Sequence, residues 1–374
     1  MSPALTSAVR RIGPFVLCGL GVIVLILASA VFSGSRGSGY DFRAYDEAAR
    51  RIAQGTPLYL ADTVTRYNAG LYADLYIYPP QLAMALVPLT VFDQSAATVA
   101  WFVLRLVALG LGCLAMPVRP WIRFAVLGIA GLSFPVLYDL NLGNISLVVF
   151  ALSALVWRLG ERPAAGVVGA ILVAIRLPFG SLGLAWLAMR RWRLVAIAIG
   201  TGIVLLVAAV PIVGFHGYAD YLTILRGLRG ISTGPDNLSL TQSFRDAGLP
   251  DSLATLSTPL GMIISAVFTV YVAARRDPST ATVVALTTPL LLAPFFHPHY
   301  LVALLIPAAF LADRGRPWAL VLPLLGWLPG AFLPFVAVVG IVAPLFARPA
   351  TDDADAGAQT ATDSLSRTAR APSS

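Results

Sequence analysis

The feature that most constrains this chain is a succession of long apolar segments joined by short polar stretches. Of the 374 residues, 58% are hydrophobic and 12% are charged, whereas soluble domains carry about 25% charged residues. The segments lie near 12–32, 79–92, 96–117, 121–137, 144–158, 164–188, 194–215, 259–274, 281–296, 300–312, 317–329 and 331–346. Because a helix needs roughly 20 residues to cross a bilayer, we predict an all-α polytopic membrane protein of about 12 transmembrane helices.

Arginines predict how these segments are oriented. Arg10 and Arg11 precede the first segment, and the positive-inside rule places them in the cytoplasm, so the polar loop 33–78 is expected outside. In the simplest count the loop 215–258 is external too, and three later clusters are cytoplasmic: Arg190/Arg191/Arg193, Arg275/Arg276 and Arg314/Arg316. That count leaves four further arginines outside, against the rule: Arg119, Arg123, Arg158 and Arg162.

A second topology removes this conflict. If 79–117 crosses the membrane once, and 164–188 is a hairpin broken at Arg176-Leu177-Pro178, the four arginines move to the cytoplasmic side. Both topologies leave the two polar loops on the external side. Sequence alone does not choose between them.

Composition also excludes several classes of function. The net charge of +8 comes from arginines clustered between apolar segments, so membrane orientation explains it and no nucleic-acid partner is expected. Lysine is absent, which we interpret as the codon bias of a GC-rich bacterium. Cys18 and Cys113 both lie inside apolar segments, which argues against a disulfide framework or a cysteine metal site. Residues 349–374, rich in Ala, Thr, Ser and Asp, predict a disordered cytoplasmic tail.

The first polar loop opens with a predicted amphipathic helix over residues 42–54. Phe42, Tyr45, Ala49 and Ile52 recur at helical spacing, which is typical of a short helix lying at the membrane interface. Asp41 stands where an N-cap residue belongs. Two interpretations of Asp41 therefore stay open: a solvated helix cap, or a carboxylate presented to a ligand.

Other polar residues lie at the ends of apolar segments. Tyr78 belongs to a Tyr-Ile-Tyr-Pro-Pro motif just before the segment 79–92, and Asn144 opens the segment 144–158. Arg176 lies deep in an apolar segment, where an unpaired charge is costly, so it is expected to face a cavity or a partner. Beside a helix break it is a candidate phosphate ligand. Arg105 is also intramembrane but has no helix breaker beside it, and a structural role is favoured there.

The C-terminal half adds an amide and two histidines. Asn237 lies in the second polar loop, and His297-Pro298-His299-Tyr300 lies at the junction of two late apolar segments. A His-x-His pair with no third ligand in the sequence is weak evidence for metal, and donation to a phosphate or a sugar hydroxyl is the alternative. No Asp-x-Asp pair lies near a loop apex, and no Walker motif, nucleophile elbow or His-Glu-x-x-His motif is present, so a nucleotide-dependent reaction is not expected.

The order of these motifs resembles glycosyltransferase family 87, a group of polytopic GT-C enzymes that includes mycobacterial polyprenol-phosphomannose-dependent alpha-mannosyltransferases. The motifs are Asp41-Phe-x-x-Tyr45, Gly55-x-Pro-Leu-Tyr59, Tyr76-x-Tyr78-Pro-Pro, Gly143-Asn144, Arg176-Leu-Pro178, Asn237-Leu-Ser-Leu240 and His299-Tyr300. Family members often have Gly-Gln, Lys-Pro and Asn-Gln-Ser where this chain has Gly143-Asn144, Arg176-Leu-Pro178 and Asn237-Leu-Ser239. These departures leave the sugar and the acceptor open.

The resemblance implies that residues 1–348 form a GT-C-type catalytic domain in a bacterial cell membrane, with its site facing the exterior. Its partners would be membrane lipids, a polyprenyl-phosphate-linked sugar and a lipid-linked glycan acceptor, without cofactor or metal. Asp41 would be the general base of an inverting transfer of mannose or, alternatively, arabinofuranose. Substrate binding would fall to Tyr45, Tyr78, Asn144, Arg176, Asn237, His297, His299 and Tyr300. A non-enzymatic flippase of lipid-linked sugars is the rival function.

Burial at the lipid face would raise the pKa of Asp41, whereas nearby arginines would lower it. The sequence leaves the sign of the net change open.

Overall fold

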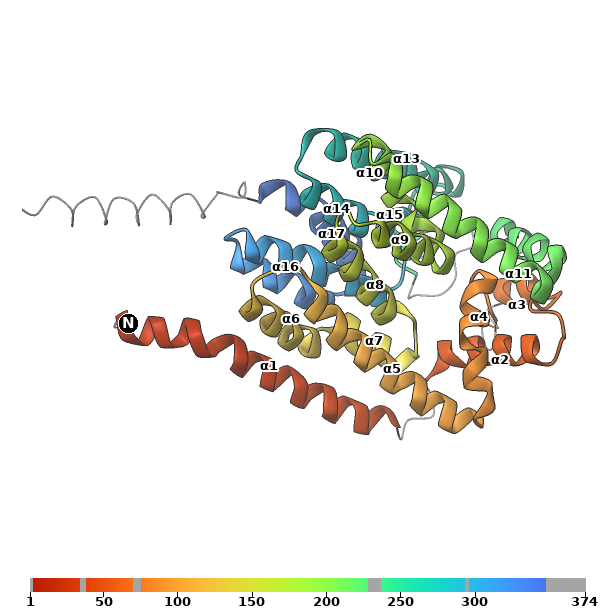
Figure 1. The fold of residues 1–374 in the computed structure, drawn as a ribbon, viewed down its shortest axis with the longest axis horizontal. Helices are drawn as coiled ribbons and strands as arrows, with labels where there is room; N and C mark the ends of the chain where they lie inside the picture. Colours follow the sequence, from red (N-terminus) through yellow and green to blue (C-terminus); the bar gives the residue numbers. More distant parts are fainter. Residues whose placement is uncertain (1–2, 34–37, 70–74, 228–236, 293–295, 348–374) are drawn as a thin grey trace, which may run out of the picture.

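A computed structural model describes residues 3–33, 38–69, 75–227, 237–292 and 296–347, and every element in these ranges is helical (Figure 1). The predicted tail, 349–374, lies outside the described residues. The α-helices are α1 Pro3–Ser33, α2 Tyr40–Ala53, α3 Thr63–Asn68, α4 Pro80–Leu86, α5 Gln94–Ala115, α6 Pro120–Leu132, α7 Phe134–Leu142, α8 Ser146–Leu159, α9 Pro163–Ile175, α10 Ser181–Ala188, α11 Trp192–Gly227, α12 Leu240–Asp246, α13 Asp251–Arg275, α14 Pro278–Thr287, α15 Pro289–Leu292, α16 Leu305–Asp313 and α17 Leu333–Val342. The 3-10 helices are η1 Val87–Val91, η2 Leu177–Gly180, η3 Pro298–Leu304, η4 Pro317–Trp327, η5 Gly330–Phe332 and η6 Ala343–Phe346.

The prediction of an all-α protein with several apolar helices is confirmed. Among the described residues, α1, α5, α11 and α13 are long and apolar enough to cross a membrane. The pair α6 and α7 forms a fifth candidate span, bent by 63° at Ser133. The remaining apolar segments form shorter helices of 10–17 residues, and the count of about 12 spans stays a prediction.

Ion pairs between the ends of helices favour the second topology. The Nε atom of Arg119 lies 3.1 Å from Asp313, and Arg191 forms an ion pair with Glu161. Arg119 and the 158–162 turn therefore lie at the same end of the bundle as the arginine clusters that are predicted to be cytoplasmic, not at the opposite end. Asn144, in turn, bonds Asp41 across 2.6 Å, which puts the turn before α8 at the same end as the first polar loop.

The segment 164–188 is a hairpin, as the second topology requires. α9 ends at Ile175, Arg176 adopts an extended conformation, and η2 begins at Leu177. The Trp186 ring of α10 lies so close to Gly169 of α9 that a Cβ atom on this glycine would collide with it. Pro178 cannot continue the hydrogen bonding of α9, so the chain reverses there and carries Arg176 at its tip.

The helix predicted over 42–54 is α2, Tyr40–Ala53, but Asp41 is not its cap. Gly39 takes the N-cap position, in the left-handed region at φ 73° and ψ 21°, and Asp41 lies in the first turn. Of the two interpretations left open for Asp41, the helix cap is wrong, because the Asp41 carboxylate binds the Asn144 side chain and Gly39 takes the N-cap position. The placement of α2 at the interface stays a prediction, although Asp46 and Arg51 on its polar side are buried.

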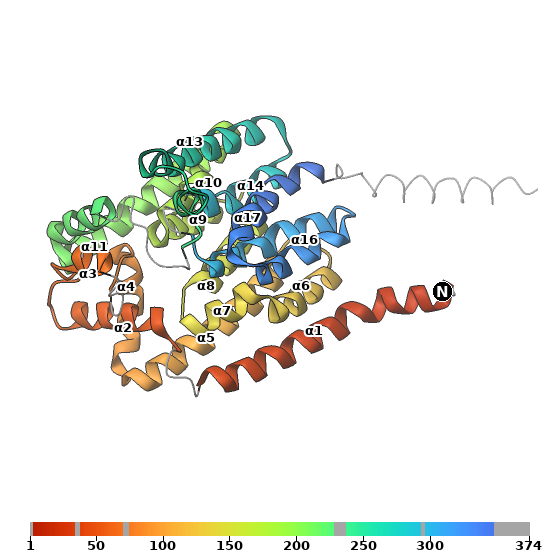
Figure 2. The same cartoon turned by 180° about the vertical axis from the view of Figure 1, so that it is seen from behind.

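The first candidate membrane span, α1, packs on the bundle through a glycine contact. α1 runs along the outside of the bundle against α6, as both views show (Figures 1 and 2). Gly21 on α1 faces Gly128 and Gly131 on α6, and a Cβ atom at any of the three would collide with the facing backbone. Small residues of this kind allow membrane helices to approach closely. The α1–α6 contact therefore depends on the absence of side chains there.

We expect Gly21→Val to separate α1 from α6 and to destabilise the protein by about 1–3 kcal/mol, the usual cost of overpacking. Gly19→Val is the matched control, because Gly19 is exposed on the same helix and a Cβ atom there meets no atom within 4 Å. Thermal unfolding in detergent, followed by size-exclusion chromatography, measures both variants. Equal melting temperatures for the two would contradict the glycine contact.

Candidate active site

The site is built on the turn that connects α7 to α8. Gly143 ends α7 with φ 79°, a conformation that favours glycine, and its carbonyl accepts a 2.8 Å hydrogen bond from Trp101 Nε1. The Gly39 amide donates to the Asn141 carbonyl at 2.8 Å. A Cβ atom on Gly143 would lie 2.9 Å from the Cβ atom of Phe42. The start of α2 therefore docks directly on this turn, and Asp41 comes with it.

Asn144 gathers three side chains at the turn. Its amide nitrogen lies 2.6 Å from Asp41 Oδ2, 3.2 Å from the Tyr45 hydroxyl and 3.3 Å from the Tyr78 hydroxyl. The short distance to Asp41 is typical of a hydrogen bond to an ionised acceptor. Three predicted site residues from two separate segments of the first polar loop thus meet one amide of the turn.

The other end of the Asn144 amide reaches Arg176. Asn144 Oδ1 accepts a 2.8 Å hydrogen bond from Arg176 Nη2, which also lies 3.2 Å from Ser146 Oγ. The Arg176 guanidinium lies over the Tyr300 ring, 4.2 Å from its centroid, in a cation–π contact. The partners of Arg176 are thus the Asn144 amide, the Ser146 hydroxyl and the Tyr300 ring. Through Asn144, Arg176 is linked to Asp41.

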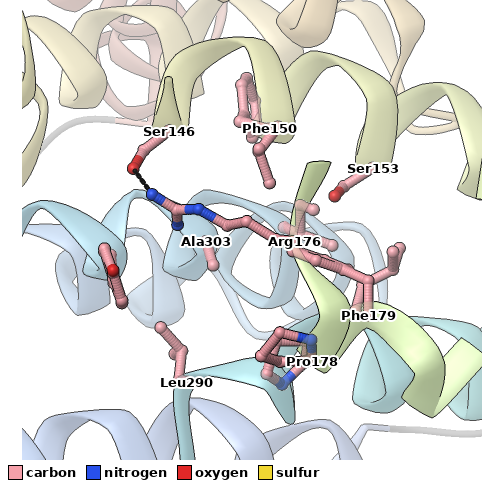
Figure 3. Close-up of a pocket in the computed structure, with 13 residues that line it drawn as sticks. Ser146, Phe150, Ser153, Arg176, Pro178, Phe179, Leu290 and Ala303 are labelled. Atoms are coloured by element: carbon pink, nitrogen blue, oxygen red, sulfur yellow. Dashed lines mark hydrogen bonds between the residues drawn. The ribbon is translucent and has the colours of Figure 1, made fainter. Parts of the chain in front are cut away.

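An adjoining pocket opens beside Arg176. Its wall is formed by α8, the break at 176–179, α14, α15, η3 and the start of α16. Figure 3 shows the Arg176 side chain extending from the break toward Ser146 at the start of α8, with Phe150 and Leu290 among the apolar residues around it. Most of the lining is apolar, so the pocket places the Arg176 guanidinium next to side chains that suit a hydrocarbon chain.

The two predicted histidines lie beside this cluster. The His299 ring is 4.7 Å from the Tyr300 ring and is stacked on His297 at 5.6 Å. His299 is 3% exposed, and neither of its ring nitrogens has a hydrogen-bond partner within the described ranges. A buried polar group without a partner is costly, so His299 is a donor or acceptor available to a ligand. Within the same ranges no three His, Cys, Asp or Glu residues gather as a metal site would need.

Asn237 is not brought to the cluster. It is buried, and its side-chain oxygen accepts from the amides of Ser239 at 3.1 Å and Phe296 at 3.3 Å. Leu238 donates its amide to the Phe296 carbonyl at 2.6 Å. In the described part of the chain Asn237 has no hydrogen bond to Asp41 or Arg176. It holds the second polar loop against the segment that leads to His297, and a contact of its own with substrate stays a prediction.

A comparison with family models matches residues 76–298 to glycosyltransferase family 87. The match spans more than half of the 374 residues and includes the Tyr78, Asn144 and Arg176 motifs. The chain belongs to glycosyltransferase family 87. Asp41, His299 and Tyr300 lie outside the matched range. No curated protein and no solved structure matches the chain.

In this glycosyltransferase the surroundings of Asp41 decide whether its pKa is raised or lowered, which the sequence leaves open. Burial of the Asp41 carboxyl at the turn between α7 and α8 raises its pKa to about 6. The hydrogen bond from Asn144 and the charges of Arg176 and Arg105 lower it, but burial is the largest influence. A carboxyl that is ionised at neutral pH and has a raised pKa is a better proton acceptor than an ordinary aspartate.

A buried ion pair lies beneath the turn of the glycosyltransferase site, and only one of its two residues was predicted. Arg105 on α5, expected to be structural, lies 3.5 Å from the carboxylate of Asp139 on α7. Asp139 was missed, although a carboxylate directly after an apolar segment, with apolar neighbours on both sides, indicates a partner. Ser146 was missed as well. The available signal was its spacing: an asparagine side-chain oxygen often accepts the backbone amide two residues later, which would place Ser146 beside Asn144.

The raised pKa gives a signed prediction for stability. A carboxyl whose pKa is raised by folding stabilises the folded state at low pH and loses that contribution as pH rises through its folded pKa, here about 6. At one pKa unit per 1.4 kcal/mol, ionised Asp41 costs the fold up to about 3 kcal/mol. We therefore expect Asp41→Asn to raise the melting temperature at pH 7.5 and to raise it only about half as much at pH 5, which lies between the unfolded and folded pKa values of this carboxyl.

Thermal unfolding at both pH values measures this difference. Glu47→Gln is the control, because Glu47 lies on α2 with a side chain 50% exposed. A gain for Asp41→Asn that is equal at pH 5 and pH 7.5 would contradict the raised pKa.

Proposed function

We propose that this glycosyltransferase transfers mannose from a polyprenyl-phosphate donor to a lipid-linked glycan or glycolipid at the external face of a bacterial membrane. The observation that carries the proposal is the link from the Asp41 carboxylate through Asn144 to the Arg176 guanidinium, beside an apolar pocket. In this link Asp41 is the proposed proton acceptor and Arg176 is the proposed ligand of the donor phosphate. Arabinofuranose on the same carrier is the alternative donor sugar.

In the proposed reaction the acceptor hydroxyl gives its proton to Asp41 while its oxygen attacks the anomeric carbon of the donor. The bond from that carbon to the phosphate oxygen breaks, and its electron pair leaves with the polyprenyl phosphate. Attack opposite the leaving group inverts the anomeric configuration. The products are the new glycoside, polyprenyl phosphate and a proton on Asp41.

The leaving phosphate gains negative charge, which the site is suited to stabilise. Arg176 offers a guanidinium whose Nε atom is buried without a hydrogen-bond partner inside the described ranges, and His299 offers unpaired ring nitrogens. Guanidinium groups bind phosphate oxygens through paired N–H donors, and donors already in place stabilise charge that develops in the transition state. Tyr45 and Tyr78, which bond Asn144, and His297 stay proposed contacts to the sugar or phosphate.

The apolar pocket supports a lipid-borne donor. Val149, Phe150, Leu286 and Leu290 line the space next to Arg176, so a phosphate at the guanidinium would leave its hydrocarbon chain against apolar walls. Polyprenyl phosphate is itself an adequate leaving group. The proposed reaction therefore requires no nucleotide and no cofactor.

A flippase of lipid-linked sugars is the non-enzymatic rival. A transporter site typically lies near the bilayer midplane, whereas Asp41, Tyr45 and Tyr78 belong to the first polar loop at one end of the bundle. That position favours transfer over translocation. The two functions differ in product: transfer makes a new glycosidic bond, and translocation only moves the labelled lipid across the membrane.

We expect Asp41→Asn to insert normally and to lose about 10²–10⁴-fold in transfer rate, the usual contribution of a general base. The assay uses membrane vesicles with radiolabelled polyprenyl-phosphate mannose and native lipid acceptors, and chromatography separates the labelled glycolipid. Glu47→Gln, on the same helix with an exposed side chain, should transfer at the wild-type rate. Wild-type turnover in Asp41→Asn would remove the residue from the base role.

We expect Arg176→Gln to weaken binding of the donor at least about tenfold, because a buried charged partner of the phosphate is lost. Inhibition of the transfer assay by polyprenyl phosphate, the proposed product, measures binding at the same subsite. Arg193→Gln, an exposed arginine on α11, is the matched control. An unchanged inhibition constant in Arg176→Gln would place the phosphate elsewhere.

A further inference from the structure

Arg105 and Asp139 form a buried ion pair directly beneath the turn that holds Asn144. Arg105 is 2% exposed and Asp139 is 0% exposed, and their nearest charged atoms are 3.5 Å apart. Arg105 comes from the middle of α5, and Asp139 lies in the last turn of α7. Neither residue belongs to the cluster that would contact substrate.

Both residues bind the backbone of the turn. Arg105 donates to the Asp139 carbonyl at 2.8 Å and to the Leu140 carbonyl at 3.1 Å. The Asp139 carbonyl also accepts from the amides of Gly143 at 3.0 Å and Asn144 at 3.3 Å. A cation is favoured at the end of a helix because the last carbonyls carry partial negative charge. Arg105 thus closes the end of α7 from which Asn144 projects.

The Asp139 carboxylate holds the other side of the turn. Its Oδ2 atom accepts the Ser146 amide at 3.2 Å, the first amide of α8, which also lies 3.1 Å from Asn144 Oδ1. The pair therefore ties the end of α7 to the start of α8. Asn144 lies between these two ties, and its side chain binds Asp41 on one side and Arg176 on the other.

Stability alone does not account for such a pair. Taking two charges out of water costs several kcal/mol each, and apolar residues of the same size often stabilise a fold as well or better. The surroundings on α5 are apolar, so a leucine or methionine at position 105 would suit packing. What apolar side chains cannot supply is the pair of donors for the carbonyls and the charge near Asp41.

We propose that Arg105 and Asp139 are positioning residues for the base: they fix the 143–146 turn so that Asn144 orients Asp41, and their opposite charges set how readily Asp41 ionises. This inference rests on the proposed role of Asp41. The positive charge of Arg105 favours the carboxylate form of Asp41, and the negative charge of Asp139 opposes it.

Several titratable groups face Asp41 from the elements around it. They are Tyr45 on α2, Tyr78 before α4, Arg105 on α5, Asp139 on α7, Arg176 at the α9 break and Tyr300 on η3. Among these groups, Arg105 and Asp139 bind the turn itself and are not proposed to contact substrate. Substituting them changes the charge near Asp41 while the proposed substrate ligands stay in place.

The test compares Arg105→Gln, Arg105→Lys and Asp139→Asn. In Arg105→Gln we expect kcat per folded molecule to fall about tenfold or more, as a displaced catalytic geometry does, with KM for the donor within about twofold. The acid limb of the pH profile of kcat/KM should move to higher pH in Arg105→Gln and to lower pH in Asp139→Asn. Arg105→Lys keeps the charge but not both carbonyl bonds, so kcat should fall while the limb stays.

Arg51→Gln is the matched control, because Arg51 is buried and donates to the Leu58 carbonyl at 3.0 Å, away from the turn. If a single charge change prevents folding, the double variant Arg105→Gln/Asp139→Asn leaves no charge unpaired, and the same loss of kcat is expected. Wild-type kcat and an unmoved acid limb in the folded variants would overturn the proposal and leave the pair a purely structural feature.

A second readout separates this inference from the proposed reaction. Hydrophobic carbodiimides modify protonated carboxyls, so the pH dependence of Asp41 labelling, followed by mass spectrometry, reports its ionisation without turnover. The labelling midpoint should move up in Arg105→Gln and down in Asp139→Asn. If wild-type protein transfers no sugar but the midpoints move so, the proposed function fails while the charge effect stands. Unmoved midpoints would overturn that effect.

Discussion

The side-chain amide of Asn144 is the contact on which the arrangement of the site depends. Its nitrogen donates to Asp41 and its oxygen accepts from Arg176, so one planar group fixes a carboxylate and a guanidinium at once. Asp41 and Arg176 belong to segments more than a hundred residues apart. An apolar side chain at position 144 would leave both charged groups without this shared partner, in surroundings where an unpaired charge is expensive.

The membrane fold explains how three distant segments reach that amide. α6 and α7 bend by 63° and end at the Gly143 turn. α2 docks on this turn through Gly39 and Phe42. The α9–α10 hairpin enters from the opposite end of the bundle and reverses at Pro178, so its tip carries Arg176 into the same place. Broken helices are tolerated inside a membrane protein where they line a cavity, and this break borders the pocket next to the site.

Family membership and this geometry agree on the class of chemistry but rest on different parts of the chain. The family match begins at residue 76 and therefore says nothing of Asp41. It is the hydrogen bond between Asp41 and Asn144, inside the matched range, that connects the first polar loop to the family core. Burial at this contact also explains why the pKa of Asp41 rises to about 6 although two arginines lie nearby.

By itself the sequence determined that the chain is an all-α membrane protein and that 42–54 is helical, and it offered a helix break at Arg176 within one of two topologies, because hydrophobic periodicity and proline chemistry act over short distances. It did not decide between two topologies, it left Asp41 open between a helix cap and a ligand-facing carboxylate, and it did not show that Asn237 bonds Ser239 and Phe296 away from Asn144. Tertiary structure decided these points. Which donor meets which acceptor depends on helix packing across the bundle, and spacing along the chain carries no information about those distances.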